Sequence, residues 1–162
     1  MKLIFATNNP HKSEEAQEIL GPAFTVVIPA SLGFPGDLPE THETLRGNSI
    51  QKACAVWNLF QSSCFADDTG LEVDALNGAP GVYTARYAGS DKDPAANRRR
   101  LLKELEGLPF EKRTARFRCV VSFSALPNVF TIRISGGASP STLNCVPQAT
   151  LFSALLVQYG LS

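Results

Sequence analysis

Three short segments of the sequence carry the side chains best suited to chemistry. The first, residues 7–12, is a polar stretch that follows a short apolar run. A strand that ends in such a loop at the start of a helix presents free backbone N–H groups and a partial positive charge, which bind phosphate oxygens. Lys12 falls in the first helical turn, where a cation opposes the helix dipole unless an anion is bound. Taken alone, an asparagine-capped helix with a solvated lysine is the simpler interpretation, and no Walker loop is present.

The second segment is acidic. Asp67 and Asp68 stand in the tetrapeptide Asp-Asp-Thr-Gly, directly after a strand-like run. Adjacent strand residues point to different sides, so at most one of the two enters a site while the other braces a turn. A carboxylate at the carboxyl end of a strand is well placed to bind magnesium and to orient water. Taken alone, the tetrapeptide is most simply a turn.

The third segment brings in Glu40, just ahead of a predicted helix that carries Asn48 and Lys52 four residues apart. An acid near a helix start is favourable in itself, so the feature has a plain structural explanation too. Together, however, the three segments form a coherent set. Glu40 and Asp68 suit a hard cation such as Mg²⁺, which takes one or two protein carboxylates. Lys12 and Lys52 suit phosphates.

The hydrophobic pattern predicts the elements that must position these residues. Strands are expected at 3–6, 24–28, 64–66, 71–76 and 114–123, and helices at 10–20, 44–60 and 97–106. Loops rich in glycine and proline are expected at 31–41 and 77–89, and a turn at 67–70. Alternating strands and helices predict an α/β fold, with a mixed central sheet flanked by helices, in a single domain over residues 1–162.

Composition limits the classes of function. Fifteen basic and fifteen acidic side chains cancel, which argues against a nucleic-acid or anionic-membrane partner. No apolar run approaches the roughly 20 residues of a membrane span, and no signal peptide precedes the first strand. The four cysteines lack metal-ligand spacing and are expected to be free thiols, so we predict a cytoplasmic protein. Every acid lies at or before Glu111, and residues 134–162 carry no charge.

Residues 2–123 resemble the inosine/xanthosine triphosphate pyrophosphatase family. The likeness is carried by four stretches and their spacing: Ala6-Thr7-Asn8-Asn9 with Lys12; Glu40-Thr41 with Asn48 and Lys52-Ala53; Asp67-Asp68-Thr69-Gly70-Leu71-Glu72-Val73; and Gly78-Ala79-Pro80-Gly81-Val82-Tyr83-Thr84-Ala85-Arg86-Tyr87-Ala88-Gly89. The last motif is long enough to be specific. Asn97, Leu101-Leu102 and Arg116-Phe117 extend it.

The resemblance implies an elongated, two-lobed fold, a homodimer, and magnesium-dependent hydrolysis of ITP, dITP or XTP to the monophosphate and pyrophosphate. Such an enzyme clears non-standard purines from the nucleotide pool. By position, the resemblance assigns metal binding to Glu40 and Asp68, and proton acceptance from the attacking water to Asp68. It assigns substrate binding to Thr7, Asn8, Asn9, Pro10, His11, Lys12, Lys52 and Thr69.

The sequence departs from the family pattern in two places. Gly47 stands where the family usually has glutamate, which weakens the expected metal or phosphate network. Beyond about residue 123 the family's Phe-Gly-Tyr-Asp, lysine and Ser-His-Arg elements, which recognise the base, are absent. We interpret residues 134–162 as an atypical replacement tail, and the fold as incomplete at its C-terminal end. Two alternatives to an active enzyme follow: a nucleotide or pyrophosphate binder with little or no turnover, and a module that pairs with an intact relative.

Overall fold

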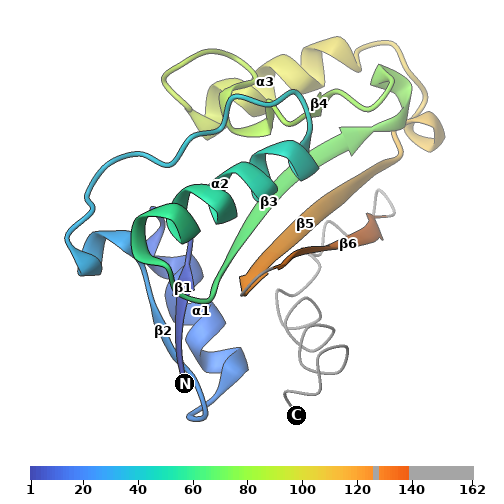
Figure 1. Ribbon diagram of the computed structural model, residues 1–162. Coiled ribbons are helices and arrows are strands. Elements are labelled where there is room, and N and C mark those ends of the chain that lie inside the picture. The colour runs from blue at the N-terminus through green and yellow to red at the C-terminus, as the bar shows by residue number, and fades with distance from the viewer. Residues whose placement is uncertain (126–127, 139–162) are drawn as a thin grey trace. The chain divides into compact units, whose positions relative to one another are not determined.

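A mixed β-sheet forms the framework of the protein. The computed structural model describes the backbone of residues 1–125 and 128–138 and the side chains up to residue 124. Within these residues the sheet has the order β2-β1-β3-β5-β6, and β4 pairs with β3 outside this path (Figure 1). β1 runs parallel to β2 and β3, whereas β4 is antiparallel to β3, so the predicted mixed sheet is confirmed. The strands are β1 (Lys2–Phe5), β2 (Thr25–Val27), β3 (Cys64–Val73), β4 (Pro80–Gly81), β5 (Ala115–Ala125) and β6 (Asn128–Ala138).

The described chain divides into two compact units. The first contains Met1–Asp68 and Val120–Ile134, with the helices α1 (Pro10–Leu20) and α2 (Leu45–Phe60). The second contains Thr69–Cys119 and residues 135–138, with α3 (Pro94–Glu104). Short 3-10 helices occupy Pro29–Leu32, Asp74–Leu76, Thr84–Arg86 and Phe110–Lys112. A single domain over the whole chain stays a prediction.

Local sequence signals set the ends of α1, as predicted. The side chain of Asn9 caps the helix by accepting a hydrogen bond from the backbone N–H of His11 at 3.0 Å. Gly21 ends it at φ +66°, a left-handed conformation that glycine adopts without a Cβ clash. Ala16 and Leu20 form the buried stripe.

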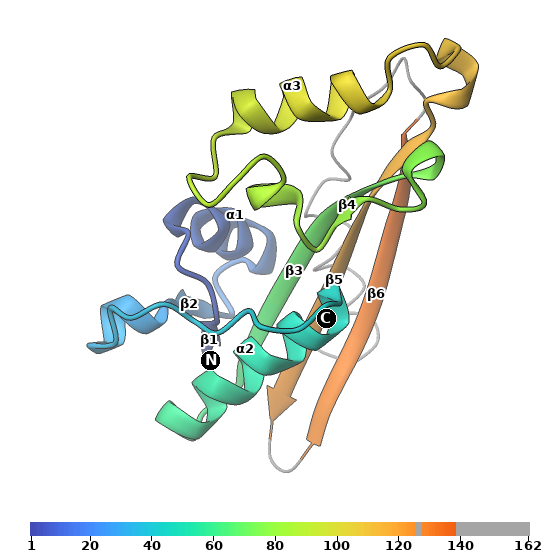
Figure 2. The ribbon, with the colours of Figure 1, turned by 90° about the horizontal axis from the view of Figure 1, so that it is seen from above.

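α2 begins where the hydroxyl of Thr44 accepts a hydrogen bond from the backbone N–H of Gly47 at 3.0 Å. Figure 2 shows α1 and α2 on opposite faces of the part of the sheet that carries β1 and the start of β3. Each face of that part of the sheet therefore receives side chains from a different helix.

Small and branched apolar side chains form the core of the first unit between α2 and the sheet. On the other face of the sheet, Phe5 and Phe65 of adjacent parallel strands stack with ring centroids 4.3 Å apart. Close contact between a helix and a sheet requires small residues at the interface, which the alanines supply. The central cluster consists of Ile4, Ala6, Ala53, Val56, Cys64 and Ala66, with Val27, Leu32, Leu38, Trp57 and Phe60 packed against it.

Three expectations about local structure are wrong. The predicted turn at 67–70 does not form, because β3 runs without interruption from Cys64 to Val73. The turn assignment rests on the composition of Asp-Asp-Thr-Gly, whereas in the structure Asp67 is buried and ion-paired within the strand. The end of the strand predicted at 71–76 is a 3-10 helix, Asp74–Leu76. α3 begins at Pro94, three residues earlier than expected, because Asp93 caps it.

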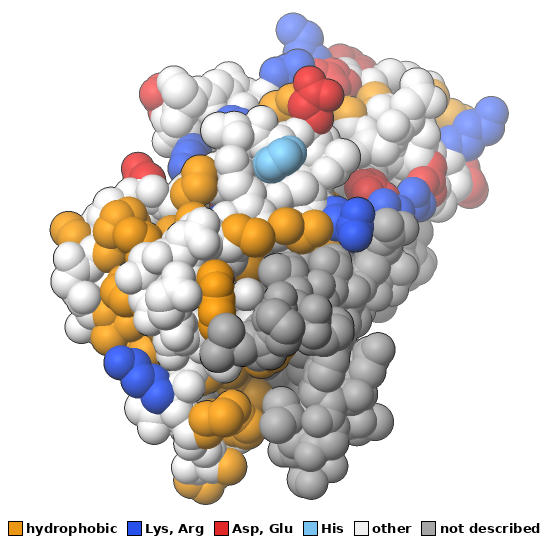
Figure 3. Space-filling view, viewed as in Figure 1, with side chains coloured by type: hydrophobic (Ala, Val, Ile, Leu, Met, Phe, Trp, Pro, Cys, Tyr) orange, Lys and Arg blue, Asp and Glu red, His pale blue; other side chains and the backbone are white. Residues whose placement is uncertain are grey.

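Charged side chains are unevenly distributed over the surface. On the face drawn in Figure 3, hydrophobic side chains lie mainly over β1, β2 and α2, whereas most charged side chains lie over α3 and its flanking segments. Arg98, Arg99 and Arg100 are exposed, as expected for a solvated helix face. In the part of the chain that the structure describes, no helix is both long and apolar enough to cross a membrane. Residues 139–162, most of the predicted atypical tail, lie outside the described residues.

Cys64 gives a test of the packing in the first unit. Its thiol is fully buried and donates to the carbonyl of Ala53 at 3.3 Å, and burial raises its pKa from 9.0 to about 12. The folded protein therefore keeps this thiol protonated at pH values where the unfolded chain ionises it. Its contribution to stability is complete below pH 9 and is lost as the pH rises from 9 toward 12.

We expect the free energy of unfolding of the wild type to fall relative to that of Cys64→Ala by up to about 2 kcal/mol between pH 9 and pH 10.5. Urea unfolding of both proteins at several pH values measures this difference. A difference that does not change with pH would show that the thiol is not shielded from solvent.

Candidate active site

The polar segment 7–12 links the end of β1 to the start of α1. β1 and β3 are parallel with Phe5 opposite Phe65, so two further residues along each chain bring Thr7 level with Asp67. The hydroxyl of Thr7 accepts a hydrogen bond from the backbone N–H of Asn9 at 3.1 Å, which fixes the loop. The predicted arrangement of strand, polar loop and helix N-terminus is confirmed, and it can bind an anion.

Lys12 lies in the first turn of α1 and reaches back to the sheet. Its ammonium is 2.6 Å from the carboxylate of Asp67, whose side chain is 8% exposed. This pairing explains why a cation is tolerated at a helix N-terminus. It also places the lysine at the base of the 7–12 loop, where phosphate oxygens would bind.

Asp68, the next residue of β3, belongs to a different cluster because successive strand residues face opposite sides of the sheet. It accepts a hydrogen bond from the side-chain amide of Asn48 at 3.1 Å. The ammonium of Lys52 lies 3.9 Å from Asp68 and 2.7 Å from Glu40, so one lysine of α2 serves two carboxylates. The prediction that Asp67 and Asp68 face different ways is confirmed.

The environment of Asp68 adjusts its acidity. Burial raises the pKa of this carboxyl, while the neighbouring Lys52 and the hydrogen bond from Asn48 lower it, and burial is the largest effect. A general base works best when its pKa approaches the working pH, and burial moves Asp68 in that direction.

Glu40 and Asp68 also form a donor set that fits magnesium. Both carboxylates converge on one positive charge, the ammonium of Lys52. A hard cation that takes one or two protein carboxylates, with phosphate and water completing its shell, matches this set. No group of three or more acids, histidines or cysteines with metal-binding geometry occurs among the described residues. Substrate and solvent would therefore supply the remaining ligands.

The other predicted substrate residues are less closely grouped. Asn8 donates to the carboxylate of Asp37 at 3.0 Å, which ties the loop to the glycine- and proline-rich segment. Asn9 and Pro10 form the start of α1. His11 is exposed and its ring lies 3.5 Å from Glu14. Thr69 is exposed on β3 and is the first residue of the second unit.

Two features near the acids emerge only from the structure. Asn48, which the sequence places in the family motif four residues before Lys52, is 1% exposed and contacts Asp68 directly. Its place in that motif is the available sequence signal. At Gly47 a Cβ atom would lie 2.6 Å from the Cβ of His42, so His42 occupies the space that a larger residue would need. The glycine is therefore required by a close contact in this chain.

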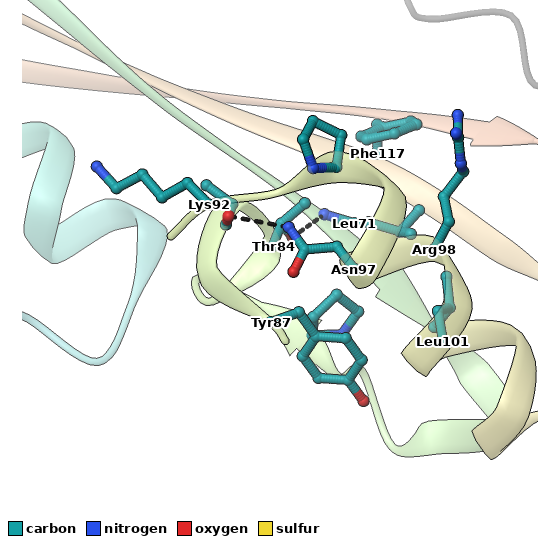
Figure 4. Close-up of a pocket in the computed structure, with 11 residues that line it drawn as sticks. Leu71, Thr84, Tyr87, Lys92, Asn97, Arg98, Leu101 and Phe117 are labelled. Atoms are coloured by element: carbon teal, nitrogen blue, oxygen red, sulfur yellow. Dashed lines mark hydrogen bonds between the residues drawn. The ribbon is translucent and has the colours of Figure 1, made fainter. Parts of the chain in front are cut away.

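The long glycine-rich motif at 78–89 lies in the second unit, where Asn97 of α3 fastens it. The Asn97 side chain accepts from the backbone N–H of Ala88 at 2.6 Å and donates to the carbonyl of Ala85 at 2.9 Å. Beside these contacts is a largely apolar hollow of about 400 Å³, shown in Figure 4. Its lining includes Tyr87, Leu101 and Phe117, and none of the predicted catalytic, metal or substrate residues.

Fold and site together define a mixed-sheet α/β protein with two acid–lysine clusters beside a helix N-terminus. The chain belongs to the Ham1 family, whose model matches residues 3–139. The dITP/XTP pyrophosphatase of Desulforamulus reducens is 50% identical over 131 residues, which cover 79% of this chain and 64% of that protein. The dITP/XTP pyrophosphatase of Bacillus subtilis is 46% identical over 134 residues, which cover 82% of this chain and 67% of that protein. The chain thus spans about two-thirds of the length of these relatives, and slightly less for Desulforamulus reducens.

Solved structures agree with this assignment. The Staphylococcus aureus Ham1 protein is 36% identical with a TM-score of 0.74, and the match covers 86% of this chain and 73% of that chain. A HAM1 protein from Coxiella burnetii is 29% identical with a TM-score of 0.78, and the match covers 86% of this chain and 72% of that chain. The predicted α/β fold and the family resemblance are both confirmed.

Proposed function

We propose that the chain hydrolyses non-standard purine nucleoside triphosphates, dITP, ITP or XTP, to the monophosphate and pyrophosphate with magnesium. The observation that carries the proposal is the convergence of Glu40 and Asp68 on Lys52, with Lys12 of α1 paired to Asp67, the preceding residue of β3. Relatives that share this part of the chain are named dITP/XTP pyrophosphatases. Assembly into a homodimer stays a prediction.

The residues of the chain divide the work between binding and proton transfer. The N-terminus of α1 and Lys12 would bind the triphosphate through charge and backbone N–H groups. Lys52 is paired with two carboxylates. Once a magnesium ion binds these acids, the ammonium of Lys52 would be available to pair with phosphate oxygens. Asp68 would orient a water molecule and accept its proton during attack on phosphorus.

Magnesium would be held by Glu40 and Asp68. When bound, it would offset negative charge on the phosphate oxygens and lower the barrier to displacement of pyrophosphate. Charge stabilisation of this kind supplies most of the catalysis in phosphoryl transfer, because the protein has little covalent chemistry to perform.

A second candidate function is nucleotide or pyrophosphate binding with little or no turnover. It is favoured by one observation: residues 124–162 contain none of the base-recognition elements that the family resemblance implies after about residue 123. A binder that recognises only the phosphates would barely distinguish ITP from ATP.

Pyrophosphate release from dITP, XTP, dGTP and ATP, by purified protein with magnesium, separates the two functions. We expect release from dITP and XTP to exceed release from ATP at least tenfold, and EDTA to abolish it. The Asp68→Asn variant serves as the background control. Folded protein that binds these nucleotides but releases no pyrophosphate would favour the binding function and contradict the proposed one.

A further inference from the structure

Asn48 joins two parts of the site that are far apart in sequence. Its side-chain amide donates to Asp68 at 3.1 Å, while its carbonyl oxygen accepts from the backbone N–H of His42 at 2.9 Å. The Asn48 side chain is almost fully buried and both of its bonds are partly buried, which limits competition from water. Asn48 therefore links the strand that carries one acid to the segment that carries the other.

Residues 40–42 each contact α2, as the bonds on either side of the Asn48 contact show. Glu40 is bound by Lys52 at 2.7 Å. The backbone N–H of Thr41 donates to the side-chain carbonyl of Gln51 at 3.0 Å, and the Gln51 amide donates back to the threonine hydroxyl at 2.8 Å. Unlike the Asn48 contacts, the bonds between Thr41 and Gln51 are exposed.

The close fit of His42 on α2 restricts the segment further. The imidazole approaches the backbone of Gly47 so closely that a Cβ atom there would lie 2.7 Å from the Cγ of His42. The backbone N–H of His42 is thereby directed at Asn48, one residue along the helix.

We propose that Asn48 is a positioning residue of the site, whose amide sets the separation of Glu40 and Asp68 by tying the 40–42 segment to β3. This inference rests on the proposed function, because it concerns the same two carboxylates. Two acids that converge on a single cation bind it well only if their separation is fixed in advance. Residues that orient metal ligands affect metal affinity or activity by about 10–100-fold when replaced.

Four single-residue variants separate positioning from general support of α2. Asn48→Ala removes both bonds. If that variant does not fold, Asn48→Ser replaces it, because serine keeps a polar side chain that is too short to bridge His42 and Asp68. Ser49→Ala is the matched control. Ser49 is fully buried and donates to the carbonyl of Ala66 at 3.1 Å. Its oxygen also lies 2.9 Å from the hydroxyl of Ser122, and in the described part of the chain it is hydrogen-bonded to neither acid. Gln51→Ala loosens only the exposed bonds to Thr41.

Amide hydrogen exchange, measured by NMR on the protein without nucleotide or metal, tests whether the Asn48 side chain protects the His42 N–H. We expect the His42 N–H to exchange faster in Asn48→Ala and at the wild-type rate in Ser49→Ala. In Gln51→Ala the Thr41 N–H should exchange faster instead. An unchanged His42 rate in Asn48→Ala would overturn the inference whatever the activity.

Binding of Mn²⁺ alone, followed by the EPR signal of the free ion, tests the consequence for the carboxylates. We expect Asn48→Ala to bind Mn²⁺ about 10–100-fold more weakly than the wild type, and Ser49→Ala to match the wild type. In the pyrophosphate assay, kcat should fall more than KM changes in Asn48→Ala, because Lys12 and Lys52 remain.

The outcomes distinguish the inference from the proposed function. A wild type that neither binds Mn²⁺ nor releases pyrophosphate contradicts the proposed function. An active wild type with wild-type Mn²⁺ affinity in Asn48→Ala, or equal weakening in Ser49→Ala, contradicts the positioning role alone.

Discussion

Asp68→Asn is expected to lower the rate of pyrophosphate release from dITP by roughly 10²–10⁴-fold while the protein stays folded. The asparagine has the size of aspartate but cannot accept the proton of the attacking water, and it is a poorer ligand for a hard cation. The fold should tolerate the change. Lys52 keeps Glu40 at 2.7 Å, and the loss of a partly buried charge removes a desolvation cost.

Asp74→Asn is the matched control for this variant. Asp74 lies in the second unit, where it is half-exposed and pairs with Arg116 at 2.7 Å. It carries the same charge as Asp68 but contacts no predicted site residue in the described structure. We expect wild-type activity from it. Near-normal turnover in Asp68→Asn, with circular dichroism and urea unfolding unchanged, would refute the assignment of the base.

Lys52→Met is expected to lower kcat/KM for dITP by about 10²–10³-fold. Methionine retains most of the apolar stem, so packing of the 7%-exposed side chain is largely preserved and the lost charge dominates. Without the ammonium, Glu40 and Asp68 repel each other and the phosphates lose a positive partner. We also expect the free energy of unfolding to fall by about 1–3 kcal/mol, because two carboxylates lose their counter-ion.

The double variant with Lys52→Met and Glu40→Gln tests whether repulsion between Glu40 and Asp68 causes the loss of stability. Removing one acid should recover part of the stability lost in Lys52→Met, while activity stays low. Lys103→Met, which removes an exposed cation of α3, is the control for net charge and should leave turnover unchanged. A Lys52→Met protein with wild-type KM and kcat would show that this lysine does not act on the substrate.

The candidate site was largely predictable because its parts have local signatures. The polar loop and Asn9 cap predicted a helix N-terminus, and that is where Lys12 lies. Alternation along a strand correctly predicted that Asp67 and Asp68 face different ways. The specific motif at 78–89 supported the family, although the structure places it in the second unit rather than among the acids.

The error at 67–70 has a tertiary cause, because the partner of Asp67 is distant in the sequence. The tetrapeptide at 67–70 has turn composition, yet Lys12 neutralises Asp67 and the strand continues. The weakening of the metal network by Gly47 stays a prediction, and the structure adds that this glycine accommodates His42.

Short-range signals account for the ends of α1 and α2, and the sequence also carries the residue types of the site and membership of the Ham1 family. Capping groups and hydrophobic periodicity act over a few residues, so they can be interpreted without the fold. The pairing of each acid with its lysine depends instead on the tertiary structure. Lys12 and Asp67 are 55 residues apart and Asn48 and Asp68 are 20 apart, and they meet only because the parallel pairing of β1 with β3, and the packing of a helix on each face, bring them together.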